Sequence, residues 1–228
     1  MGGQACVLYG AAEFSRDTDF AVLCEPRNLE RLGAALVELQ AKNIAVPPFE
    51  ADYLLRGHAV HFRCGHPDAA NLRVDVMSVM RGVAPVRELW ERRTTVLSAN
   101  DEEIELLSLP DLVRAKKTQR DKDWPMLRRL VDANYFANRE APTAAHIEFW
   151  LRELRTPELL REVAQAFPLE TTQLTVERNV LDALAQDDET ALIVALEAEE
   201  KCERIADRAY WQPLRAELEQ LRRQIRRS

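Results

Sequence analysis

The sequence predicts an α+β fold, with a small mixed β-sheet flanked by helices and followed by an all-α C-terminal domain. Glycine usage is the first indication, because the chain has 7 glycines and none of them lies beyond Gly82. Strand-like apolar runs occur before that glycine, whereas leucines recur at helical spacing through the glycine-free remainder. We therefore expect an α/β part over residues 1–108 and a helical domain over residues 109–228.

The N-terminal part begins with a short helix and a buried strand. Residues 4–9 form an apolar segment that we interpret as a short helix. Residues 19–23 contain the apolar run Phe-Ala-Val-Leu, which is typical of a buried strand. A helix is expected between residues 26 and 41, because its leucines recur at spacings of 3, 4 and 3 and so share one face. These leucines are Leu29, Leu32, Leu36 and Leu39.

An antiparallel hairpin is predicted after this helix. Pro47-Pro48 excludes regular secondary structure where the helix has ended. Two strand-like runs follow, over residues 59–64 and 72–77, and the turn-rich segment 65–68 joins them. We expect these two runs to pair with each other and to contribute two strands to the sheet.

Successive helices are predicted from Leu109 onward. Three of them carry Pro in the first turn, where the missing N–H costs nothing. The last stretch forms either one long helix or two helices that are interrupted at Trp211-Gln212-Pro213. The expected helices cover residues 110–120, 125–136, 143–154, 157–166, a segment from about 170, and 188–227.

Composition narrows the class of protein. The chain has 31 Lys and Arg against 38 Asp and Glu, a net charge of −7, and 46% hydrophobic residues, which excludes a disordered chain. No apolar run approaches the roughly 20 residues that span a bilayer, and the N-terminus lacks the order of a signal peptide. We therefore expect a cytoplasmic protein without a membrane partner. The negative charge disfavours nonspecific nucleic-acid binding but leaves room for a local basic patch.

The cysteines also indicate a reducing compartment. No two of them form a C-x-x-C pair, which argues against a disulfide framework. We expect all four to be buried thiols. They are Cys6, Cys24, Cys64 and Cys202.

Two carboxylates at the start of the first strand point to metal chemistry. Asp17 and Asp19 are separated by one residue, so on a strand both side chains lie on the same face. Two neighbouring carboxylates repel each other unless a cation neutralises them, and oxygen ligands suit Mg²⁺ or Mn²⁺. The other interpretation is an ordinary turn that leads into a strand, since Asp is a favoured turn residue.

A third carboxylate, Asp75, lies in an apolar strand-like run with a valine on each side. An ionised side chain there is costly to desolvate, so we expect it to bind metal or to form an ion pair with Arg73 or Arg63. Three carboxylates on adjacent strands can hold two metal ions for an in-line phosphoryl displacement. Backbone N–H groups at Gly2 and Gly3 could then hold the triphosphate of a nucleotide.

These residues resemble a known signature. Gly2-Gly3, thirteen residues, then Asp17-Thr18-Asp19-Phe20, with Asp75 on a later strand, is similar to the motif of the DNA polymerase β-like nucleotidyltransferase superfamily. The nearest branch is that of AbiEii-type and uncharacterised bacterial nucleotidyltransferases, which have Ser or Thr where Ser15 stands here. The resemblance implies a nucleotidyltransferase core over residues 1–108 and a helical domain after it.

The resemblance also implies an activity and its partners. Members of the superfamily transfer a nucleoside monophosphate from an NTP, with Mg²⁺, to a hydroxyl or phosphate acceptor. Asp17 and Asp19 would bind both metals, and Asp75 would bind the catalytic metal and help to activate the acceptor. The acceptor would be an RNA end, such as that of tRNA, or a protein side chain. A role as a toxin or phage-defence component, with an antitoxin protein as partner, follows by family analogy alone.

A second stretch, over residues 109–123, matches the same branch. By the resemblance, Lys116 or Lys117 neutralises triphosphate charge and Arg120 lies beside the nucleotide, while Asp121 accepts a proton or orients Arg120. Residues 114–129 hold seven basic and two acidic residues, which predicts a local cationic surface. The alternative interpretation is a solvated helix face, the usual environment of a run of charges.

The sequence departs from the family pattern at two places. The family has a strand before Gly-Gly, whereas Met1 directly precedes Gly2, so we expect the sheet to be one strand shorter. Glu13 also replaces an Arg that is frequent in the family.

Two other functions are alternatives to this one. One alternative function is nucleotidyl transfer to an antibiotic hydroxyl. The other is a non-catalytic descendant that senses nucleotides or binds a partner.

Three histidines and a cysteine lie close together in the sequence and suggest a zinc site. Strand parity places His58, Cys64 and His66 together but puts His61 on the opposite face, so the four side chains do not converge. Contact between a histidine and the base or ribose of the substrate is the alternative. The sequence therefore predicts no zinc.

Overall fold

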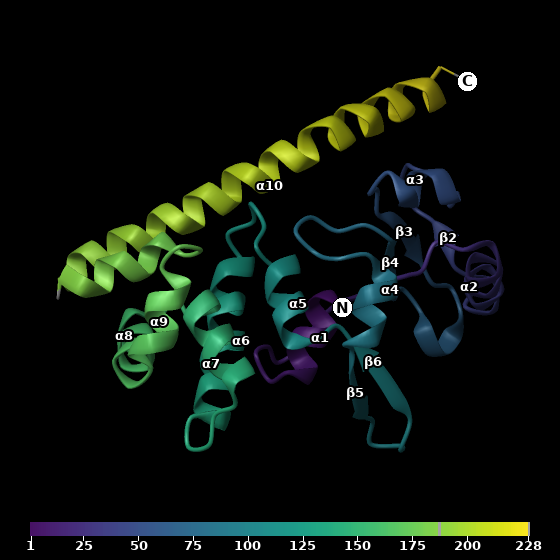
Figure 1. Ribbon diagram of the computed structural model, residues 1–228. Helices are drawn as coiled ribbons and strands as arrows, with labels where there is room; N and C mark the ends of the chain where they lie inside the picture. Colours follow the sequence, from purple (N-terminus) through teal and green to yellow (C-terminus); the bar gives the residue numbers. More distant parts are fainter. Residues whose placement is uncertain (187, 228) are drawn as a thin grey trace. The chain divides into compact units, whose positions relative to one another are not determined.

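The computed structural model describes residues 1–186 and 188–227 (Figure 1). Its packing divides the chain into two compact units. The first unit comprises Met1–Ala115 and the chain from Ala209 to its last described residue, and the second comprises Lys116–Arg208. The expected boundary after residue 108 is not tested by these packing units and stays a prediction.

A four-stranded mixed sheet forms the centre of the first unit. Its strand order is β1-β4-β3-β2, with β1 parallel to β4 and the other pairs antiparallel. The predicted hairpin is confirmed, since β3 and β4 are its two strands and pair antiparallel. The bounds are β1 Asp17–Ala21, β2 Lys42–Asn43, β3 Val60–Arg63 and β4 Arg73–Met77.

One face of this sheet is apolar and packs against helix α2 (Pro26–Glu38) and helix α3 (Ala51–Leu55). Side chains at alternate strand positions make up the buried cluster together with Leu36 of α2 and Leu54 of α3. The predicted leucine stripe is confirmed, because Leu29 and Leu32 of α2, and Leu39 directly after the helix, are partly buried against the same cluster. The strand residues of the cluster are Val60, Phe62, Val74 and Val76. The opposite face of the sheet is therefore left for polar side chains.

The rest of the first unit consists of short elements that the sequence predicted only in part. Helix α1 (Gly2–Leu8) corresponds to the expected short helix, whereas α3, α4 (Val86–Glu91) and the hairpin of β5 (Thr94–Leu97) and β6 (Glu103–Leu106) were not predicted. A single turn of 3-10 helix, η1 (Pro67–Ala69), lies between β3 and β4.

Helix α5 (Leu109–Ala115) is held in the first unit by a buried carboxylate near its start. Asp111 accepts hydrogen bonds from Arg92 at 2.6 and 3.0 Å and from the Ser108 hydroxyl at 2.6 Å. Burial alone would raise the pKa of Asp111, but Arg92 and Ser108 outweigh it and lower that pKa. The expected helix over 110–120 was too long, because α5 ends at Ala115.

The second unit is helical, as the sequence predicted. Its interior contains Trp150, whose indole N–H donates to Asn134 Oδ1 at 2.8 Å, and the buried leucines Leu127, Leu130 and Leu151. Helices α6 to α8 each begin within two residues of the predicted start. The bounds are α6 Asp123–Asn138, α7 Ala144–Glu153, α8 Pro157–Ala166, α9 Pro168–Leu174, η2 Asn179–Gln186 and α10 Glu189–Ile225.

The last stretch is one long helix rather than two. Helix α10 continues through Pro213, which lacks the N–H of one helical hydrogen bond. Its residues up to Arg208 pack with the second unit, and those from Ala209 onward pack with the first. Of the two alternatives for residues 188–227, the interrupted helix is therefore wrong.

All four cysteines are free thiols, but they are not all buried. Cys6 and Cys64 are buried as expected, whereas Cys24 is partly exposed and Cys202 lies on an exposed face of α10. The expectation of four buried thiols is therefore wrong for two of them. Among the described residues, no helix is both long and apolar enough to cross a membrane.

Candidate active site

The polar face of the four-stranded sheet brings the predicted carboxylates onto neighbouring strands. In the register of β1 and β4, Asp19 lies opposite Asp75 and Asp17 lies opposite Arg73. On β3, His61 lies opposite Asp75. Because paired residues project to the same side of a sheet, all five side chains lie on the face opposite the buried valines of β4.

Asp75 is the most buried of these carboxylates, with 7% of the residue exposed. Its Oδ1 is 2.9 Å from Nε of Arg73 and 2.8 Å from Nδ1 of His61. Burial alone would raise the pKa of Asp75, but the hydrogen bonds from His61 and Arg73 outweigh it, and the pKa is lowered. Of the two alternatives for Asp75, the ion pair with Arg73 is therefore present, whereas Arg63 donates to the Asn71 carbonyl instead.

The ionised state of Asp75 decides the tautomer of His61. A carboxylate only accepts hydrogen bonds, so the Nδ1 atom that faces it must carry the proton. A terminal guanidinium nitrogen of Arg73 also lies 3.2 Å from Nδ1, but two donors cannot bond to each other. His61 and Arg73 are therefore two separate donors to the same oxygen, Oδ1 of Asp75.

Gly2 and Gly3 stand where any side chain would collide with the site. A Cβ on Gly2 would lie 1.8 Å from Oδ2 of Asp19, and a Cβ on Gly3 would lie 2.3 Å from the Ser15 hydroxyl oxygen. Gly2 also has a φ of 68°, a left-handed conformation that favours glycine. The Gly-Gly pair therefore lets the start of α1 approach Asp19 and Ser15 closely.

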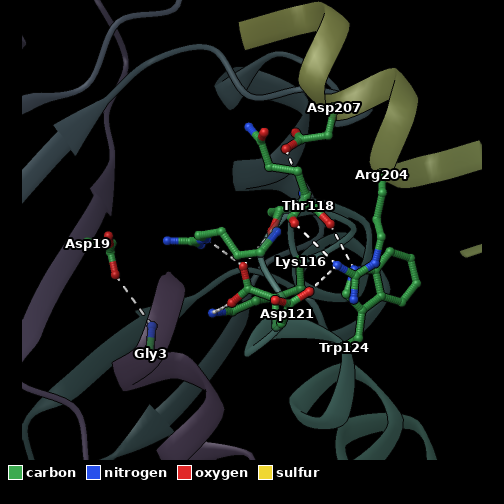
Figure 2. Close-up of polar contacts among 11 residues, drawn as sticks. Gly3, Asp19, Lys116, Thr118, Asp121, Trp124, Arg204 and Asp207 are labelled. Carbon is green, nitrogen blue, oxygen red and sulfur yellow. Dashed lines mark hydrogen bonds and ion pairs between the residues drawn. The ribbon is translucent and has the colours of Figure 1, made fainter. Parts of the chain in front are cut away.

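The backbone at this approach already has partners. The N–H of Gly3 donates to Oδ2 of Asp19 at 3.4 Å, which Figure 2 shows, and the Ser15 hydroxyl donates to the Asp17 carbonyl at 2.9 Å. One of the N–H groups that were expected to hold a triphosphate thus faces a carboxylate. Ser15 supports the turn into β1 rather than projecting freely.

The fit of these residues to a metal ion is partial. Across residues 1–186 and 188–227, no three Asp, Glu, His or Cys side chains lie close enough together to form a metal-binding group. Within the predicted set, Oδ1 of Asp75 already accepts hydrogen bonds from Arg73 and His61. The donor chemistry nevertheless suits Mg²⁺, since Asp17, Asp19 and Oδ2 of Asp75 offer only oxygen.

The histidines of the cluster each face a different polar group. His61 faces Asp75, the buried His58 places Nε2 2.7 Å from Oε2 of Glu217 on α10, and His66 accepts from the Asp68 N–H. Burial lowers the pKa of His58, and the charge of Arg56 adds to this effect. Each histidine therefore has its own polar partner within the first unit.

In the second unit, two of the predicted nucleotide-binding cations converge on a carboxylate that the sequence analysis did not single out. Asp123 is 1% exposed, and its two oxygens lie 3.3 Å from Nζ of Lys116 and 2.7 Å from Nε of Arg120. The Thr118 hydroxyl donates to the same carboxylate at 2.6 Å. Burial alone would raise the pKa of Asp123, but Lys116, Thr118 and Arg120 outweigh it and lower that pKa.

The other two predicted residues of this stretch also pair with charges of their own unit. Lys117 lies 2.7 Å from a carboxylate oxygen of Glu153, and the exposed Asp121 pairs with Arg204 of α10 (Figure 2). Arg120 is therefore oriented by Asp123, whereas the sequence analysis expected Asp121. Three of the seven basic residues of the predicted cationic surface, Lys116, Lys117 and Arg120, are therefore paired with carboxylates.

Sequence reasoning missed three residues that define these two networks. Asp123 lies inside the quoted stretch 109–123, and its place at the start of a helix gave no sign that it is buried. Arg73 was named only as an alternative partner of Asp75. His61 could have been found by aligning the two strands of the predicted hairpin, because that register sets it opposite Asp75.

Comparison with known proteins adds no assignment. No protein-family model matches the chain, and no curated protein is similar to it. These comparisons therefore place the chain in no family.

Proposed function

We propose that the protein is a Mg²⁺-dependent nucleotidyltransferase that moves a nucleoside monophosphate from an NTP to a hydroxyl or phosphate acceptor. The observation that carries the proposal is the register of the sheet. Asp19 and Asp75 lie opposite each other on adjacent parallel strands, with Asp17 on the same face. Carboxylates on one face of neighbouring strands are the oxygen-rich surface that divalent-cation phosphoryl chemistry requires.

In this proposal, Asp17, Asp19 and Oδ2 of Asp75 hold Mg²⁺ or Mn²⁺. A bound divalent cation supplies charge neutralisation for the triphosphate and polarises the phosphorus under attack. Gly2 and Gly3 contribute by their missing side chains, which leave room for Asp19 and Ser15. The chain's own part is thus to orient the carboxylates and to keep the triphosphate side of the site free of bulk.

The cationic residues of the second unit have a secondary place in the proposal. Lys116, Lys117 and Arg120 are proposed to bind triphosphate oxygens, with Asp121 as the residue that accepts a proton. Each of the three cations has a carboxylate partner in the structure, so binding phosphate would require an exchange of partners. The proposed function therefore depends more on the carboxylates of the first unit than on these side chains.

The proposal is tested by incubating the full chain with each α-labelled NTP and Mg²⁺, together with total tRNA or with a cell lysate. We expect label to enter RNA or protein, and Asp19→Asn to abolish the transfer. Asp68→Asn is the matched control, because Asp68 is an exposed carboxylate of the same unit and its side chain is 93% exposed. Absence of transfer with every NTP, or transfer that survives Asp19→Asn, would contradict the proposal.

A second candidate is a nucleotide-binding protein without catalysis. The observation that favours it is the ion pair between Arg73 and Asp75, which already neutralises the third carboxylate. Calorimetric titration with NTP separates the two candidates. Binding that is equal with and without Mg²⁺, with no pyrophosphate released, would support the non-catalytic protein.

A further inference from the structure

His61 is a polar residue in the middle of the sheet that neither the motif nor the proposed chemistry assigns. It lies on β3, opposite Asp75, and its side chain is 26% exposed. Its Nδ1–H points at Oδ1 of Asp75 at 2.8 Å. In the described part of the chain, neither a hydrogen bond nor an ion pair reaches Oδ2 of the same carboxylate.

The arrangement restricts what Asp75 can offer to a ligand. Two donors on one oxygen hold the carboxylate in a single orientation, because rotation about its terminal bond would break both hydrogen bonds. Oδ1 already accepts two hydrogen bonds, one from His61 and one from Arg73. A cation that binds Asp75 is therefore confined to Oδ2.

We propose that His61 is a positioning residue, which orients Asp75 so that Oδ2 alone is presented to a divalent cation. The inference rests on the proposed function, since it concerns the same metal site. Hydrogen bonds from outside the coordination sphere fix the orientation of metal ligands, and their loss typically weakens metal binding by about 10- to 100-fold. His61 acts through Asp75 and needs no contact with the nucleotide.

His61 is a cleaner probe of this role than Arg73. Removing Arg73 also removes a positive charge from the site, and that loss by itself strengthens cation binding. The two effects of an Arg73 substitution therefore oppose each other. Replacing His61 leaves Arg73 in place and chiefly removes the hydrogen bond from Nδ1 to Oδ1.

The test uses Mn²⁺ alone, with the full chain and no nucleotide, and follows the free ion by electron paramagnetic resonance. His61→Leu removes the donor, His61→Gln moves its amide away from the Nδ1 position, and His61→Asn keeps an amide N–H near it. His66→Leu is the matched control, because His66 is a histidine of the same unit that faces Asp68 rather than Asp75. Circular-dichroism melting checks that each variant is folded.

We expect Mn²⁺ affinity to fall about 10- to 100-fold in His61→Leu and His61→Gln, while His61→Asn and His66→Leu stay close to the wild type. If His61→Leu does not fold, the difference between His61→Gln and His61→Asn decides. Wild-type affinity in His61→Gln, or equal losses in His61→Asn and His61→Gln, overturns the positioning role.

The failure of the proposed function has a different signature. If the wild type binds no Mn²⁺ that Asp19→Asn removes, both the metal site and the role of His61 are overturned. If Asp19→Asn removes Mn²⁺ binding but the His61 variants keep it, the metal site stands and only the positioning role falls.

Discussion

Asp123 provides the sharpest test of the second unit, because its removal leaves a buried lysine without a counter-charge. The Asp123 side chain is 2% exposed and that of Lys116 is 9% exposed, with 3.3 Å between Nζ and Oδ1. Removing one partner of a buried ion pair typically costs about 3–5 kcal/mol, and we expect this loss in Asp123→Ala. Arg120 adds little to it, since 56% of its side chain is exposed.

Asp121→Ala is the matched control two residues away. The Asp121 side chain is 97% exposed, so we expect no measurable change in the free energy of unfolding when it is removed. Urea denaturation of both variants at pH 7, followed by tryptophan fluorescence, measures the difference. Trp124 is a suitable reporter because its indole N–H donates to the Thr118 carbonyl beside the network. Equal losses in the two variants, or a loss below about 1 kcal/mol in Asp123→Ala, would refute the reasoning.

The same pair has a predictable pH dependence. The pKa of Asp123 is lowered in the folded protein, so its ionised form stabilises the fold. This contribution is present above the unfolded-state pKa of about 4 and is lost as the pH falls through the lower folded value. The stability difference between the wild type and Asp123→Ala should therefore shrink on acidification. A difference that grows at low pH would contradict the assigned direction.

Two further predictions concern a glycine and a buried carboxylate. Gly2→Ala should reduce nucleotidyl transfer by at least about tenfold, because the new Cβ displaces Asp19. Gly10→Ala is the control, because Gly10 also has a positive φ, of 75°, but open space around it, and this variant should keep its activity. Equal activities would contradict this. Asp132→Asn should be more stable than the wild type at pH 7 but not near pH 4, because burial raises the pKa of Asp132 and its ionised form opposes folding. Thermal unfolding at both pH values measures this, and a pH-independent difference would contradict it.

Much of the fold was predictable because local patterns encode it. Apolar and polar residues alternate along β3 and β4, and the leucines of α2 recur at helical spacing, because one face of each element is buried. The predicted hairpin and the predicted leucine stripe were both confirmed. The β5–β6 hairpin was missed although a signal existed. Val96 and Ile104 pair across it, and the polar residues between the two strands are typical of a turn.

The end of α5 could not be predicted in the same way. Residues after Ala115 have good helix propensity, and the sequence therefore suggested a helix as far as residue 120. The chain leaves the helix because its groups find distant partners. The N–H of Gln119 donates to Asp207, which is 88 residues later in the sequence. Tertiary contacts of this kind override local propensity, and one sequence does not reveal them.

In the candidate site, the partners of each carboxylate were likewise predicted only in part. The rule that positions i and i+2 share a strand face put Asp17 beside Asp19, and it equally puts Arg73 beside Asp75. A carboxylate with a cation two residues away has a counter-charge on its own strand, whereas Asp17 and Asp19 have none on β1. The negative charge of Asp17 and Asp19 must therefore be neutralised by another element or by a bound cation. Mn²⁺ binding that is lost in Asp19→Asn would show that a bound cation neutralises these carboxylates.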